Sequence, residues 1–313
     1  MRPSASRAIS LLIGLSRRHC AASAPLATAF PQRLLAVLII GWSTPASGAD
    51  LSVAVAANFA ATLRTLVHQY QRQSNDTVRM SVGSSGKLYA QIVQGAPYDI
   101  FLSADSELPG MLANQQLALR DSRFTYALGT LAVWHARGDP DNTSNGGLDL
   151  GATRIVALAS PRHAPYGRAA RQVLIAEQQW DALVASKRLA LAESVGQAWH
   201  YAATGNADVA FVALSQLRQA RPTARPTGLA PGSAATPYQA QTAIESLQSP
   251  DNPGFYWLPP QHLYAPIVQQ GVILAASKNL AAARRFCAWL ISDPVAVNII
   301  HAAGYHTDAA VLK

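Results

Sequence analysis

Four short segments of this 313-residue chain share one pattern, in which a run of β-forming residues ends in small or hydroxylated residues and a helix then begins. The segments are VAVAANF (53–59), SVGSSGK (81–87), ALASPRHAPYG (157–167) and ALAESVGQ (190–197). At each junction the first helical turn leaves backbone N–H groups without partners, and the positive end of the helix dipole points beyond the strand. Several such junctions meeting at one place would bind an anion.

The first two junctions also offer side-chain donors. Asn58 directly follows a predicted strand, where an asparagine can bind a ligand or serve only as a helix cap, and both interpretations remain open. The segment Gly83-Ser84-Ser85-Gly86 combines two glycines, which let the backbone approach a ligand, with two hydroxyl groups at a helix start. An ordinary glycine-rich turn is the alternative, and the spacing differs from that of a Walker A loop.

The last two junctions offer mainly backbone donors. Pro165 lies near a predicted helix entrance, where its missing N–H costs little, and it leaves the N–H groups of Tyr166 and Gly167 free. Val195 follows the strand of the fourth segment and would contribute only its backbone. Both Tyr166 and Val195 also suit a hydrophobic core.

The predicted cage consists of neutral donors. N–H and O–H dipoles fix a geometry and sort tetrahedral oxyanions by size and protonation, whereas long cationic side chains grip an anion less selectively. Lys87, Arg162, His163 and Arg168 lie near the four segments. We expect most of them to face solvent or to attract anions rather than to touch the bound one.

The elements that would position the junctions alternate between β-rich runs and helical patterns, which indicates βαβ units and a mostly parallel sheet covered on both faces. Strands are predicted at 51–56, 77–82, 100–102, 154–159, 189–192 and 209–212, and helices at 60–73, 88–94, 167–178, 196–203, 280–291 and 295–303. Two long β-prone stretches, 124–135 and the run after Pro266, would carry the chain out of one lobe and back. The sequence thus predicts an α/β fold of the two-lobed clamshell type, with two crossover segments and a ligand between the lobes.

Composition divides the chain into a leader and two lobes. The apolar run 34–42 and the small residues Ser47 and Ala49 predict that residues 1–49 are a signal peptide with a long n-region, cut before Asp50, which would place the protein in the periplasm. Lobe 1 is predicted to cover 50–130 and 267–313, and lobe 2 to cover 131–266. Within lobe 2, the range 221–253 is rich in Pro, Ala, Thr, Gly and Ser and is interpreted as a mobile surface insertion.

The charge of the chain does not favour nucleic acid as a partner, and its cysteine content excludes an internal disulfide bond. The formal net charge is +8, but the leader holds five arginines and no acidic residue, so the remainder has 20 basic and 17 acidic residues and a net charge of +3. Without a clustered basic stripe, nucleic acid is not an expected partner. Cys20 lies in the leader, so Cys287 would stand alone in the mature chain as a buried, inert thiol.

A secreted hydrolase is the rival class of function. No G-x-S-x-G motif frames Ser84 or Ser85, and no H-x-x-x-H or H-E-x-x-H spacing indicates a zinc site. Asp99, Asp105 and Glu107 lie close together in the sequence, yet acidic residues near a helix start are commonly dipole partners. We therefore expect no enzyme activity, no cofactor and no catalytic residues.

The motifs resemble those of the periplasmic molybdate-binding proteins of ABC importers, the ModA family, whose members also take tungstate. The resemblance covers most of residues 50–313 apart from the insertion. It rests on AVAANF, GSSGKLYAQIVQGAPYDIFLSAD, SRFTYALGTLAVW, SPRHAPYG, ESVGQA, ADVAFVALSQ, YAPIVQQGVI and AAGYH. The block that begins with GSSG is the most specific of these.

The resemblance implies that uncharged groups of Asn58, Ser85, Tyr166 and Val195 bind the oxyanion. Ser85 would use its hydroxyl and its backbone N–H, and the other three mainly their backbone N–H groups. Ala57 stands where members usually have Ser or Thr, so one hydroxyl is missing, and Ala213 stands where some members place a tyrosine. Molybdenum would be held only as the oxyanion, through the same residues.

The resemblance further implies a monomer that docks on a membrane permease, which a cytoplasmic ATPase powers. The anion cage itself suits sulfate, phosphate or a small organic acid as well. Only the family motifs favour molybdate over these ligands.

Overall fold

The computed structural model describes residues 48–136, 148, 150–219, 245–246 and 254–307. The predicted leader therefore lies outside the described residues except for its last two positions, Gly48 and Ala49. Of the predicted insertion 221–253, only Glu245–Ser246 is described, and it forms a short strand.

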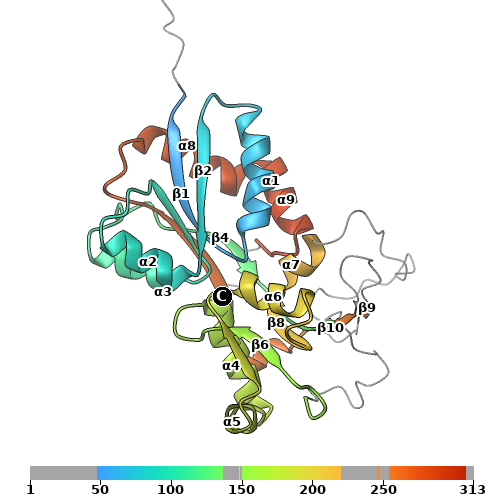
Figure 1. The fold of residues 1–313 in the computed structure, drawn as a ribbon. Helices are drawn as coiled ribbons and strands as arrows, with labels where there is room; N and C mark the ends of the chain where they lie inside the picture. Colours follow the sequence, from blue (N-terminus) through green and yellow to red (C-terminus); the bar gives the residue numbers. More distant parts are fainter. Residues whose placement is uncertain (1–47, 137–147, 149, 220–244, 247–253, 308–313) are drawn as a thin grey trace, which may run out of the picture. The chain divides into compact units, whose positions relative to one another are not determined.

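Two β-sheets organise the described residues (Figure 1). The first sheet has the order β2-β1-β3-β11-β4 and consists of β1 (Asp50–Ala56), β2 (Thr77–Gly83), β3 (Ile100–Ser103), β4 (Phe124–Gly129) and β11 (Ile267–Ile273). The second sheet has the order β7-β6-β8-β5-β10-β9 and consists of β5 (Leu131–His135), β6 (Val156–Ala159), β7 (Leu189–Ala192), β8 (Val209–Ala213), β9 (Glu245–Ser246) and β10 (Phe255–Trp257).

The chain crosses between the sheets twice, as predicted. Thr130 separates β4 of the first sheet from β5 of the second, and β11 returns the chain to the first sheet after β10. A short 3-10 helix, Gln261–Leu263, lies in the return segment.

Both sheets are mixed, whereas the sequence predicted mostly parallel pairing. The strands β2, β1 and β3 run parallel, as do β7, β6 and β8, but β11 and β5 run antiparallel to their neighbours. These two strands run antiparallel because each one follows a crossing of the chain from one sheet to the other. The strands β1, β3, β6 and β8 end at the junction of the two sheets, so β5 and β11, which start there, must run the opposite way.

Helices cover both faces of each sheet because residues along a buried strand alternate between the two faces. In the first sheet, Leu51, Val53 and Val55 pack with α1 (Ala60–Gln71), α8 (Leu280–Ser292) and α9 (Pro294–Ala302). Ala54 faces the other way, towards α2 (Ser85–Val93) and α3 (Glu107–Asn114). Figure 1 shows α2 and α3 to the left of β1 and β2, and α1 and α9 to their right.

The second sheet repeats this arrangement. Val156 and Leu158 pack with α4 (Pro165–Ala176) and α5 (Trp180–Ala185), whereas Ala157 packs with α6 (Val195–Ala203) and α7 (Leu214–Gln219). Four helices begin earlier than the sequence predicted. They are α2, α4, α6 and α9, which start at Ser85, Pro165, Val195 and Pro294. Ser85, Tyr166 and Val195 therefore lie inside the first helical turns, where backbone N–H groups have no intrahelical acceptor.

The cysteine prediction is confirmed for the described part of the chain. Cys287 is a buried free thiol on α8, and burial raises the pKa of this thiol to about 12, so it stays protonated at neutral pH. Among the described residues, no helix combines the length and the apolar character that crossing a membrane requires.

The closing helices stabilise the first sheet through Phe286, which is fully buried and meets the ring of Tyr70 edge-on with 5.0 Å between centroids. We expect Phe286→Ala to lower the free energy of unfolding by about 3–5 kcal/mol, since it leaves a cavity in a closed core. Urea denaturation measures this loss. Val295→Ala on α9, where the side chain is 46% exposed, is the control and should change the stability by less than about 0.5 kcal/mol.

Candidate functional site

A cavity lies where the strand ends of the two sheets face each other. The space between its lining atoms, open solvent included, amounts to about 210 Å³. All five residues singled out from the sequence line it, namely Ala57, Asn58, Ser85, Tyr166 and Val195. Ser84 and Ser194 also line it, and none of its lining residues is charged. Open α/β sheets bind ligands beyond the carboxyl ends of their strands, which is the position of this cavity.

Three helix starts surround the cavity. The residues before them, Ser84, Ala164 and Ser194, have extended backbones with ψ angles of 148°, 125° and 163°, so each chain turns sharply into its helix. In the part of the chain that the structure describes, the backbone N–H groups of the four candidate ligand residues have no hydrogen-bond acceptor. These residues are Asn58, Ser85, Tyr166 and Val195.

All four residues are buried, with exposed fractions between 1% and 4%. Buried N–H groups without acceptors are uncommon and costly, so the arrangement is suited to an acceptor that enters from outside. The positive ends of three helix dipoles add to the attraction for an anion.

Two serine hydroxyls supplement the backbone donors. The Oγ atom of Ser85 accepts the N–H of Ala104 at 3.0 Å, which leaves the hydroxyl proton available to donate. The Oγ atom of Ser84 is buried and has no partner among the described residues. Ser194 differs because its Oγ caps α6 by accepting the N–H of Gln197 at 3.3 Å. Sequence reasoning noted both hydroxyls of the GSSG segment but assigned a ligand role to Ser85 alone.

Ala57 contributes no donor. It lacks a hydroxyl, and its N–H donates to the carbonyl oxygen of Gly83 at 2.9 Å. Its methyl group lies close to Gly196, since a Cβ built on that glycine would be 3.7 Å from the Ala57 Cβ. This wall of the cavity is therefore apolar.

Asn58 is not a helix cap, so that alternative is wrong. The N-cap position of α1 is Phe59, whose side chain makes no capping hydrogen bond. Instead, Asn58 Nδ2 donates to Gln269 Oε1 at 2.8 Å and to the Tyr305 hydroxyl at 3.1 Å. The Asn58 carbonyl oxygen accepts the hydroxyls of Tyr305 and Ser215. These bonds fix the backbone of Asn58 and leave its N–H as the group that can reach a ligand.

Gln269 on β11 connects the donors of both sheets and was missed by sequence reasoning. Its side chain is fully buried, accepts the Tyr126 hydroxyl at 3.1 Å and donates to the Tyr166 hydroxyl at 3.3 Å. A glutamine inside the β-prone run IVQQGVI was the available signal. Burial raises the pKa of both Tyr126 and Tyr166 well above the usual value, so this network is uncharged at neutral pH.

The nearby cations are paired with carboxylates of the opposite sheet. Lys87 Nζ on α2 lies 2.8 Å from Glu193, which follows β7, and Arg168 on α4 lies 2.7 Å from Asp105, which follows β3. Arg162 is exposed and His163 is partly buried, and neither lines the cavity. The ion pairs join the two sheets on the flanks of the cavity and leave its interior neutral.

The sheets also meet through backbone contact. The Gly86 N–H donates to the carbonyl oxygen of His163 at 2.9 Å. A Cβ built on Gly86 would lie 2.9 Å from that same oxygen, so only glycine permits this approach without displacement. Gly167 likewise permits a close backbone approach within the second sheet, since a Cβ built on it would lie 2.2 Å from the carbonyl oxygen of Ala159.

The acidic residues of the hydrolase alternative have structural roles. Asp99 accepts the N–H of Ser52 at 2.8 Å, and Asp105 accepts the N–H of Leu108 at the start of α3 besides pairing with Arg168. Glu107 is exposed in the first turn of α3, where it complements the helix dipole. Among the described residues there is no group of three or more metal-ligating side chains that could hold a metal ion.

Known proteins resemble this chain over most of its length. Residues 51–306 match the family of bacterial extracellular solute-binding proteins. The molybdate-binding protein ModA of Rhodobacter capsulatus is 35% identical over 287 residues, which cover 90% of this chain and all of the relative. That of Azotobacter vinelandii is 34% identical over 260 residues, which cover 83% of this chain and 91% of the relative.

A solved structure gives the same result for the fold. The periplasmic molybdate-binding protein of Azotobacter vinelandii superposes with a TM-score of 0.67 at 39% sequence identity, covering 82% of this chain and 99% of that protein. The predicted two-lobed fold is therefore confirmed. The chain belongs to the ModA family of bacterial extracellular solute-binding proteins.

Proposed function

We propose that this protein is a periplasmic binding protein that captures molybdate and tungstate and delivers them to the membrane permease of an ABC importer, which a cytoplasmic ATPase powers. The observation that carries the proposal is a set of four buried N–H groups that have no acceptor among the described residues. They surround a cavity with no charged lining residue. The names of the homologous proteins support the choice of ligand.

The proposed ligand shell consists of Asn58, Ser85, Tyr166 and Val195. Their four N–H groups and the Ser85 hydroxyl would supply five neutral donors to a tetrahedral dianion. The oxyanion would be cargo, and the proposal assigns the protein no cofactor and no catalytic step. The cavity lining offers no carboxylate to accept a proton from hydrogen phosphate, which favours fully deprotonated oxyanions.

Binding would be coupled to closure of two lobes. We assign residues 50–130 and 267–313 to lobe 1 and residues 131–266 to lobe 2, in line with the membership of the two sheets. Asn58 and Ser85 belong to lobe 1, and Tyr166 and Val195 to lobe 2, so neither lobe alone completes the shell. An anion that binds the closed form more tightly shifts the population towards it. The closed monomer would then dock on the permease.

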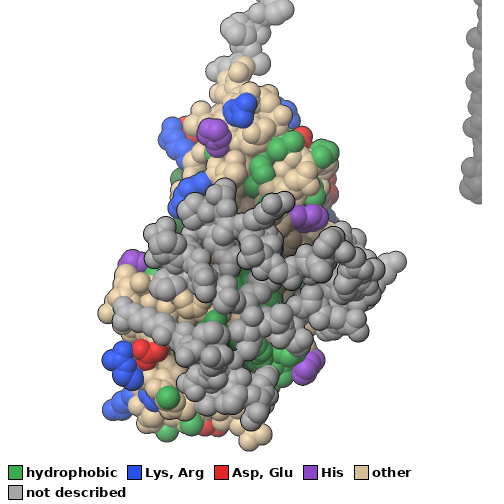
Figure 2. All heavy atoms as spheres, turned by 90° about the vertical axis from the view of Figure 1, so that its right-hand side faces the viewer, with side chains coloured by type: hydrophobic (Ala, Val, Ile, Leu, Met, Phe, Trp, Pro, Cys, Tyr) green, Lys and Arg blue, Asp and Glu red, His purple; other side chains and the backbone are tan. Residues whose placement is uncertain are grey.

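The described surface gives little support for a polyanion as partner. In Figure 2 the Lys and Arg side chains stand in separate small groups on the face that is drawn. Several cations, among them Arg79, Arg154 and Arg285, pair with Asp50, Asp208 and Asp76.

Calorimetric titration with molybdate, tungstate, sulfate and phosphate tests the ligand. We expect saturable binding of the first two and none of the others, because the family resemblance favours the larger oxyanions and the neutral lining disfavours a protonated one. Sulfate binding at an affinity comparable to that of molybdate would overturn the assignment.

The variant Ser85→Ala tests the hydroxyl donor. Affinity for molybdate should fall by about 1.5–3 kcal/mol, the range for a hydrogen bond to a charged group. Ser106→Ala is the matched control, since Ser106 precedes α3 in an exposed position and its side chain caps no N–H. Equal affinities of Ser85→Ala and the parent would show that this hydroxyl does not touch the anion. Thermal melting without ligand separates this effect from the loss of the Ala104 contact.

The variant Gly86→Ala tests closure. Its Cβ would press on the His163 carbonyl in the closed arrangement only, so molybdate affinity should fall by about 1–3 kcal/mol, the usual cost of overpacking, while the free protein keeps its stability. Gly110→Ala is the control, because a Cβ there meets only the flexible end of Arg123. If Gly86→Ala binds as tightly as Gly110→Ala, the contact is not part of the bound state.

A further inference from the structure

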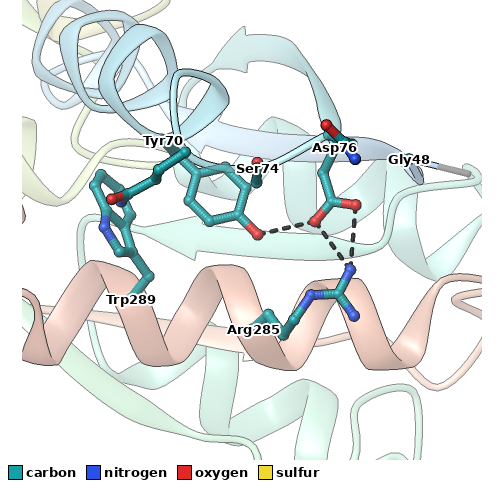
Figure 3. A pocket seen from close by; sticks show the side chains of 8 residues that line it. Gly48, Tyr70, Ser74, Asp76, Arg285 and Trp289 are labelled. Carbon is teal, nitrogen blue, oxygen red and sulfur yellow. Dashed lines mark hydrogen bonds and ion pairs between the residues drawn. The ribbon is translucent and has the colours of Figure 1, made fainter. Parts of the chain in front are cut away.

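A buried carboxylate lies at the edge of the first sheet opposite the cavity, where β1 and β2 begin. Asp76, which precedes β2, is only 5% exposed. One of its oxygens accepts the backbone N–H of Ala49 at 3.0 Å, and the other accepts the Tyr70 hydroxyl at 2.9 Å. Arg285 on α8 donates to both oxygens at 3.1 and 3.0 Å. Figure 3 shows the Tyr70 and Arg285 side chains converging on Asp76, with Gly48 beside it.

This carboxylate is ionised at neutral pH. Burial by itself would raise the pKa of Asp76, but the hydrogen bonds from Ala49, Tyr70 and Arg285 outweigh it and lower the pKa overall. Arg285 is the only cation that pairs with it among the described residues, and its side chain is 59% exposed. The Asp76 carboxylate can therefore accept a hydrogen bond from a second cationic group, at the position of the Ala49 nitrogen.

Ala49 is held on both sides of its peptide unit. Its carbonyl oxygen accepts the N–H of Thr77 at 2.8 Å, and its methyl group packs against the core of the first sheet. A chain that began at Asp50 would lose these contacts and leave the Thr77 N–H and one Asp76 oxygen with fewer partners.

Gly48 makes a different contact. It is exposed, and a Cβ built on it would lie 1.6 Å from the carbonyl oxygen of Asn75. Removal of Gly48 would leave the Asp76 carboxylate as the acceptor for the new amino group of Ala49.

We infer that the mature protein begins at Ala49 and that Asp76 binds its α-ammonium group. Hydrolysis of the Gly48–Ala49 peptide bond by a signal peptidase consumes one water and yields a carboxylate on Gly48 and an ammonium on Ala49. Ala46 and Gly48 provide the small residues that such a cut requires. The inference rests on the proposed export and moves the cut by one residue from the position that the sequence predicted.

The peptidase acts on an extended chain during export, so the folded contacts do not guide it. These contacts determine which cleaved product keeps all the interactions of the folded strand β1. A start at Ala49 keeps every contact of the strand β1 and converts the neutral N–H donor to Asp76 into a charged one. Charge-assisted hydrogen bonds are shorter and stronger than neutral ones.

The first experiment expresses the full chain in an exporting bacterium and determines the amino-terminal sequence and intact mass of the protein released by osmotic shock. We expect Ala49 as the first residue. A start at Asp50 or at any other position overturns this inference but leaves the anion-binding function intact. A chain retained with Met1 overturns the proposed export as well.

The second experiment measures acylation of the α-amino group at pH 7.5 by mass spectrometry. An amine has to lose its proton to react, and a neighbouring carboxylate raises the amine's pKa by about one unit or more. The variant Asp76→Asn should therefore be labelled about tenfold faster than the parent. Asp121→Asn, whose side chain is 78% exposed, is the control and should match the parent.

Equal labelling of Asp76→Asn and the parent would overturn the ammonium contact. In the structure Asp76 accepts the Ala49 N–H, and Tyr70 and Arg285 bind the same carboxylate, so substitution of Asp76 is the direct test. Molybdate affinity of Asp76→Asn should equal that of the parent because Asp76 does not line the cavity. This readout separates a failure of the inference from a failure of the proposed function.

Discussion

The site depends on one constraint, namely that buried backbone N–H groups need acceptors. Four such groups surround one cavity and find none among the described residues. Leaving a buried donor unsatisfied costs about 1–3 kcal/mol, and an acceptor that enters the cavity would remove this cost. Three of the four groups belong to first helical turns, where the helix itself cannot supply the acceptor.

The surrounding structure keeps these donors neutral and in place. Asn58 is fixed through its side chain and its carbonyl oxygen by Gln269, Tyr305 and Ser215, which come from distant parts of the chain. The two cations nearest the cavity pair with carboxylates across the sheets. The same contacts that hold the sheets together thus remove free charge from the site, so that geometry rather than net charge can select the anion.

Short patterns in the sequence predicted the backbone N–H donors. Contacts between residues far apart in the sequence could not be predicted from it. The strand-to-helix junctions, the two crossings and the buried Cys287 follow from short patterns of β-forming, small and apolar residues. The antiparallel strands β5 and β11, the role of Gln269 and the position of the Asn58 side chain depend on residues more than seventy positions away. The helices α2, α4 and α6 start one to three residues earlier than predicted.

A crystal structure of the protein grown with molybdate tests the central claim most directly. The account predicts the oxyanion in the cavity between the two sheets, with its oxygens within hydrogen-bond distance of the N–H groups of Asn58, Ser85, Tyr166 and Val195. Molybdate held by Lys87 or Arg168, or bound outside this cavity, would contradict the account.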